Sequence, residues 1–164
     1  MNQELKDRLH ALNEEQIQTL IDSYAYITVL IAGADGEIDS SELEWGSKLA
    51  NIRSYNDEYR LNDLFVEVEK SFQSKMESIM SKVPGGVANR YDWIKPNLEK
   101  VNDILDILDN ANAFSIYRSL LSFAKHIAKA DGGFLGFGSI SSEEKKLIGL
   151  PMINEIILEE EPES

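Results

Sequence analysis

The chain has 164 residues and no cysteine, and its 16 Lys and Arg residues against 29 Asp and Glu residues leave a net charge of −13. This length and a hydrophobic content of 43% predict one domain, residues 1–164, with a single core. The lack of cysteine excludes disulfides, thiolate zinc sites and cysteine nucleophiles, and the negative charge argues against nucleic acid as a ligand. We find neither a signal peptide nor a transmembrane segment, so we expect a soluble, cytoplasmic protein.

Helical periodicity runs through nearly the whole sequence and predicts an all-α fold of about seven helices. Five helices are long. The first is capped by Asn13 and ends at Gly33–Gly36, and the second begins at Asp39 or Ser40. The third is capped by Asn56 and ends before Pro84-Gly85-Gly86. The last two cover about residues 88–109 and 113–130. One or two short helices follow from Ser141 and Pro151, and residues 159–164 are expected to form a solvated acidic tail.

The sequence contains an internal repeat. Ile31-Ala32-Gly33-Ala34-Asp35-Gly36 matches Ile127-Ala128-Lys129-Ala130-Asp131-Gly132. The matching aspartates are 96 residues apart and the isoleucines that follow, Ile38 and Ile140, are 102 apart, so the second copy carries six extra residues. Each copy joins a long helix to the next one. The repeat therefore predicts two related halves about a pseudo-twofold axis, with the two Ala-Asp-Gly turns close together.

Acidic residues gather at both turns, with Asp35, Glu37, Asp39 and Glu42 at the first and Asp131, Glu143 and Glu144 at the second. Oxygen clusters of this kind suit hard divalent cations. The alternative is helix capping, because Asp39-x-x-Glu42 and Ser141-x-x-Glu144 both fit the capping-box pattern. An EF-hand is excluded, since Ser40 and Gly46 occupy the positions of its glycine and its bidentate glutamate. Asp35 and Asp131 precede the caps and favour the cation hypothesis.

The segments Ile31 to Glu42 and Ile127 to Glu144 resemble the duplicated Ala-Asp-Gly…Glu signature of the tellurite-resistance TerB-like family. The resemblance covers about residues 12–150. It implies an all-helical fold of two pseudosymmetric groups of helices, with acidic residues between them that bind a divalent metal. By position, it implies a ligand set of Asp35, Asp131, Glu42 and Glu144, with Asp39 and Glu37 as auxiliary residues. Among cations, Ca²⁺, Mg²⁺ or Mn²⁺ is favoured over Zn²⁺.

A glycine-rich segment, residues 132–138, carries three large apolar side chains, Phe134, Leu135 and Phe137. It lacks the motifs of phosphate-binding loops and has no preceding strand. Two interpretations stay open for the three apolar residues: burial in the domain, or contact with a partner protein.

The sequence does not indicate an enzyme. His10 and His126 are too far apart to suggest a catalytic pair, and the serines of residues 139–142 lack a nucleophile motif. The family resemblance implies a non-enzymatic role in resistance to tellurite and related stress, with other proteins as partners, including a membrane-associated stress complex. The alternative is an acidic protein-interaction module, of the immunity or inhibitor type, that binds a basic partner through its negative charge.

Overall fold

The computed structural model describes residues 1–55, 61–130 and 142–160, and these residues form seven helices and no strand, as the periodicity predicts. The helices are α1 (Gln3–Arg8), α2 (Glu14–Ala32), α3 (Ser40–Tyr55), α4 (Asn62–Lys82), α5 (Val87–Ile107), α6 (Asn110–Ala130) and α7 (Ser142–Leu147). The all-α class is thereby confirmed. No helix in these three stretches is long and apolar enough to span a bilayer.

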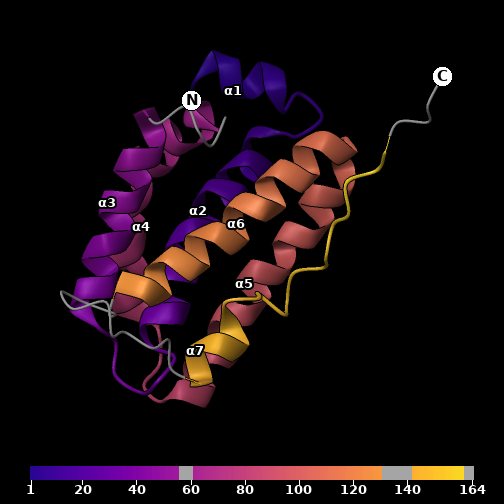
Figure 1. The fold of residues 1–164 in the computed structure, drawn as a ribbon. Coiled ribbons are helices and arrows are strands. Elements are labelled where there is room, and N and C mark those ends of the chain that lie inside the picture. The colour runs from indigo at the N-terminus through magenta and orange to yellow at the C-terminus, as the bar shows by residue number, and fades with distance from the viewer. Residues whose placement is uncertain (56–60, 131–141, 161–164) are drawn as a thin grey trace.

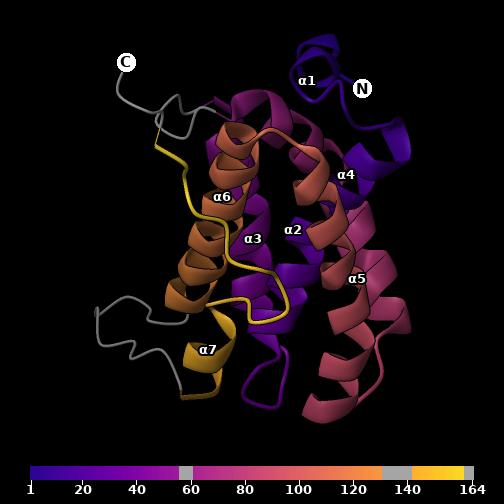
Figure 2. The same cartoon turned by 90° about the vertical axis from the view of Figure 1, so that its right-hand side faces the viewer.

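Helix α2 is the centre of the bundle. It contacts α3 and α4 on one side and α5 and α6 on the other (Figure 1). Most of its residues are buried, because apolar side chains occupy nearly every face of its second half, from Ile27 to Ala32. Helix α1 lies across one end of the bundle and α7 lies at the other end (Figures 1 and 2).

Three predicted helix boundaries hold. Asn13 caps α2 in a capping box, in which its side chain accepts from the Gln16 N–H and the Gln16 side chain accepts from the Asn13 N–H. Helix α2 ends at Ala32, directly before the first Ala-Asp-Gly turn. Helix α4 ends at Lys82, before Pro84, because proline cannot continue the hydrogen-bond ladder.

Other boundaries differ from the prediction. Helix α6 begins at Asn110 and not at Ala113, because Asp109 caps it by accepting from the Asn112 N–H at 3.0 Å. This backbone hydrogen bond is the largest of the effects that lower the pKa of Asp109. Helix α4 begins at Asn62, and the predicted cap Asn56 lies outside the described residues.

The chain ends differ as well. The short helix α1 was not expected from the sequence. Of the one or two short helices expected from Ser141 and Pro151, one is present, α7 at Ser142–Leu147, and after a turn at residues 151–153 the chain runs extended to residue 160 (Figure 2). The two ends are therefore the least predictable parts of the fold, since neither carries a full amphipathic stripe.

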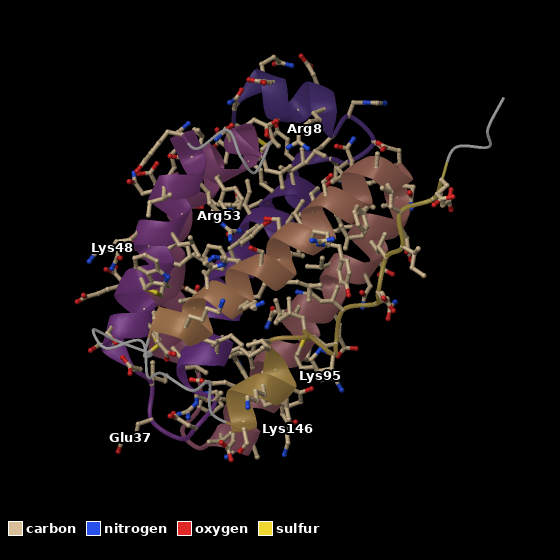
Figure 3. All side chains as sticks on the ribbon, in the orientation of Figure 1. Arg8, Glu37, Lys48, Arg53, Lys95 and Lys146 are labelled. Carbon is tan, nitrogen blue, oxygen red and sulfur yellow. The ribbon has the colours of Figure 1, made fainter. Side chains whose placement is uncertain are left out.

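The core contains a buried cation. Arg53 of α3 has no exposed surface, and its guanidinium lies 5.3 Å from the ring centroid of Phe65 on α4 and 5.4 Å from that of Phe123 on α6 (Figure 3). Its Nη2 donates to the Ser122 hydroxyl at 2.9 Å, and its Nη1 donates to the Ser119 carbonyl at 3.3 Å. Cation–π contacts and charge-assisted hydrogen bonds of this kind offset the cost of burying a guanidinium. Arg53 thereby joins α3, α4 and α6.

Tyr24 of α2 packs beside this cation, and its burial makes the free energy of unfolding fall at alkaline pH. Burial raises the pKa of Tyr24 from 10.0 to about 12, because the phenolate would lose its hydration. The neutral phenol stabilises the fold fully below pH 10, and this contribution is lost as the pH rises towards 12. We expect the free energy of unfolding to fall over this range by roughly 2–3 kcal/mol more in the wild type than in Tyr24→Phe. Urea titrations at several pH values measure the difference.

Tyr55→Phe is the control, because Tyr55 is exposed and its substitution should leave the pH dependence of wild type unchanged. An equal fall in stability for wild type and Tyr24→Phe would contradict the assignment of this effect to Tyr24.

Candidate cation site at the helix junctions

The first Ala-Asp-Gly turn joins α2 to α3. Within it, Gly36 has a φ of 127°, which side chains with a Cβ rarely adopt. The Asp39 carboxylate accepts from the N–H groups of Ser41 and Glu42 at 2.8 and 3.3 Å, and from the Ser41 hydroxyl at 2.5 Å. Asp39 therefore caps the start of α3, as the capping alternative predicted for this residue.

An arginine that sequence reasoning missed holds this turn in place. Arg90, on the first turn of α5, is 9% exposed, and its Nη2 donates to the carbonyls of Gly33, at 3.0 Å, and Gly36. A Cβ on Gly33 would lie 3.0 Å from the Arg90 Nε, so any other residue there would require the guanidinium to shift by a few tenths of an ångström. The guanidinium also opposes the negative end of the α2 dipole. The signal of this contact in the sequence is the position of Arg90 on the apolar stripe of α5, four residues before Ile94 and eight before Leu98.

The two predicted glutamates are both buried. Glu42 is 1% exposed in the first turn of α3, and Glu144 is 4% exposed in the first turn of α7. Their neighbours Ser41 and Glu143 are exposed. Carboxylates are rarely buried in this way unless they meet a cation or several hydrogen-bond donors. Glu42 and Glu144 are thus both buried glutamates at the third residue of their helices.

The helices that precede the two turns end at the same end of the bundle. Helix α2 and helix α6 both run from the α1 end towards the α7 end (Figures 1 and 2). Their carboxyl ends, Ala32 and Ala130, therefore direct their last carbonyls, and the negative ends of their dipoles, the same way. Helix α7 also contacts α2 at this end.

The remaining predicted ligands are not brought together in the described residues. Asp35 and Glu37 are exposed, and Glu37 points away from the bundle (Figure 3). Asp131 and the apolar residues Phe134, Leu135 and Phe137 lie outside the described residues. Within residues 1–55, 61–130 and 142–160, no three His, Asp or Glu side chains form a group that could hold a metal ion.

The packing of α3 explains why the first junction is not an EF-hand. Gly46 lies where α3 crosses α2 and α4, and a Cβ there would be 2.7 Å from the Thr28 side chain and 2.9 Å from the Phe72 ring. Only glycine fits without displacement of these side chains. The position at which an EF-hand has its bidentate glutamate is therefore a contact between three helices.

A cavity of about 390 Å³ lies next to the first junction, between α2, α5 and α7. Its walls are mainly apolar, formed by residues such as Val29, Leu30, Ala34, Ile94 and Leu147. A hard cation needs oxygen ligands, so this cavity does not suit one. The candidate site is accordingly the set of carboxylates at the junctions and not the cavity.

Comparisons with known proteins leave the family open. No protein-family model, no curated protein and no solved structure matches this chain. The function is therefore inferred from the geometry of the two junctions.

Arg90 provides a test of how the first turn is held. Arg90→Met removes the donor to two carbonyls at the end of α2, and we expect a loss of about 2 kcal/mol in the free energy of unfolding, with faster amide exchange at residues 33–39. Lys100→Met, at an exposed position of the same helix, should change stability by less than about 0.5 kcal/mol. Urea denaturation and hydrogen exchange measure both effects. Equal losses in the two variants would show that Arg90 does not hold the turn.

Proposed function

We propose that this chain is a non-enzymatic TerB-like protein that binds a divalent cation at its two helix junctions. In this proposal Asp35 and Asp131 supply carboxylate ligands from the turns, and Glu42 and Glu144 approach from α3 and α7. Asp39 serves as the cap of α3 rather than as a direct ligand. Water completes the coordination shell, as is common for Ca²⁺ and Mg²⁺.

The observation that carries the proposal is the burial of one glutamate at each junction. Glu42 and Glu144 are 1% and 4% exposed, although a glutamate in the first turn of a helix can reach water easily. The ends of α2 and α6 add negative potential at the same end of the bundle, where Arg90 opposes that of α2 and Lys129 lies in the last turn of α6. A divalent cation between the junctions would offset this charge.

The biological setting comes from the resemblance of the two repeated segments. It implies a role in resistance to tellurite and related stress, in which cation binding fixes how the two halves pack and so presents a surface to other proteins. Tellurium chemistry itself favours soft ligands such as thiolates, which this chain lacks. In this proposal the protein acts through partners and not by binding tellurium species.

Titration of metal-stripped protein with Ca²⁺, Mg²⁺, Mn²⁺ and Zn²⁺ tests the proposal. At a cation concentration 100-fold above the dissociation constant we expect about 2.7 kcal/mol of stabilisation, which raises the melting temperature by roughly 5–10 °C in a chain of this size. Asp35→Asn with Asp131→Asn should abolish both the heat of binding and the shift in melting temperature. Calorimetry and thermal unfolding measure the two quantities.

Glu4→Gln with Glu99→Gln is the matched control, because it removes the same charge from exposed positions on α1 and α5. This variant should bind the cation as the wild type does. No saturable binding at millimolar cation, or an unchanged melting shift in the Asp35/Asp131 variant, would overturn the proposal.

A further inference from the structure

The last described segment of the chain lies along the bundle as an extended strap, residues 152–159. It follows α7 and runs beside α5 and α6 towards the α1 end of the molecule (Figure 2). Helices α5 and α6 share few contacts, and we call the surface between them, which the strap covers, the α5–α6 groove. The strap occupies this groove.

Two asparagine side chains hold the backbone of the strap. Asn102 of α5 donates from Nδ2 to the Met152 carbonyl at 3.0 Å and accepts at Oδ1 from the Asn154 N–H at 2.8 Å. Asn110 of α6 donates to the Ile157 carbonyl at 2.9 Å and accepts from the Glu159 N–H at 2.8 Å. Both pairs therefore have the same form.

This pattern is that of a β-sheet edge. In an extended chain the carbonyl of one residue and the N–H two residues later point to the same side, where a neighbouring strand presents one donor and one acceptor. A carboxamide side chain carries the same donor and acceptor as a peptide unit. Asn102 and Asn110 thus recognise extended backbone, whatever side chains it carries.

The strap is anchored unevenly. Met152 and Ile153 are 6% and 4% exposed and join the core, and Ile156 is partly buried. The outer residues are exposed, and Ile157 and Leu158 remain 73% and 50% accessible. In the outer half, the two hydrogen bonds of Asn110 to Ile157 and Glu159 hold the backbone. Leu150, two residues before the strap, has a φ of 45°, a strained value for leucine.

We propose that the groove between α5 and α6 is a binding site for an extended peptide of another protein, and that residues 152–159 occupy it in cis. The strap itself defines the ligand: two adjacent large apolar residues, a third apolar residue three positions later, and free N–H groups at the positions of Asn154 and Glu159. Proline is excluded at these two positions because it lacks the N–H. A partner peptide binds by displacing the strap, as in other modes of backbone recognition.

The test uses the full chain and a fluorescent peptide with the sequence of residues 150–160, followed by anisotropy. Asn154→Pro with Glu159→Pro removes both strap donors and weakens the internal competitor, so we expect the peptide to bind this variant at least about tenfold more tightly than the wild type. Glu155→Pro with Leu158→Pro is the control, because these N–H groups donate no hydrogen bond within the described part of the chain. It should bind the peptide as the wild type does.

Changes in the peptide test the site without altering the fold of the protein. Methylation of the peptide nitrogens at Asn154 and Glu159 should weaken binding to the Asn154→Pro/Glu159→Pro chain at least about tenfold, whereas methylation at Glu155 and Leu158 should not. Adding Asn102→Ala and Asn110→Ala to the chain should have the same effect as the first methylation. Binding that ignores the methylation pattern would overturn the proposal. So would dimerisation of the variant chain that the peptide does not reverse, since the occupant would then be a second copy.

Discussion

The buried guanidinium of Arg53 is the constraint on which the arrangement of the helices depends. A charge with no exposed surface must receive its hydrogen bonds and its counter-potential from the protein. Here the ring faces of Phe65 and Phe123 and the oxygens of Ser119 and Ser122 provide part of them. These groups come from α4 and α6, so α3 has one position and one rotation in which Arg53 is satisfied. The α3 start, with Asp39 and Glu42, is positioned as a consequence.

Two other arginines connect elements in the same manner. Arg8 of α1 pairs with the buried Asp63 of α4 through Nε and Nη2, at 2.8 and 2.7 Å, and Arg90 of α5 holds the turn after α2. Each guanidinium links segments far apart in the sequence. Planar, multidentate donors suit this role, because one side chain can satisfy several fixed oxygens. In so acidic a chain, Arg8, Arg53 and Arg90 act as cross-links between separate elements.

The sequence predicts what depends on local periodicity and punctuation. The apolar stripes, the Asn13 cap and Pro84 predict the long helices and the end of α4, and the repeat leads to two buried glutamates at equivalent positions. The contacts of Arg90 and of Asn102 and Asn110 are not predictable in this way. Their partners are backbone carbonyls and N–H groups, which every residue carries, so nothing in the partner sequence marks them. For the same reason the sequence predicts a short helix from Pro151 and not the extended strap.

The two proposed sites differ in the chemical groups that the fold supplies to the ligand. At the junctions the fold brings two buried carboxylates, those of Glu42 and Glu144, to one end of the bundle. The proposed cation would add positive charge there, as Arg90 does beside the carbonyls of Gly33 and Gly36. At the α5–α6 groove the fold supplies neutral amides and an apolar surface. Exchange there replaces one extended chain by another, with no change in charge at the amides. Added salt should therefore weaken the junction site through screening, whereas the amide hydrogen bonds of the groove have no net charge to screen.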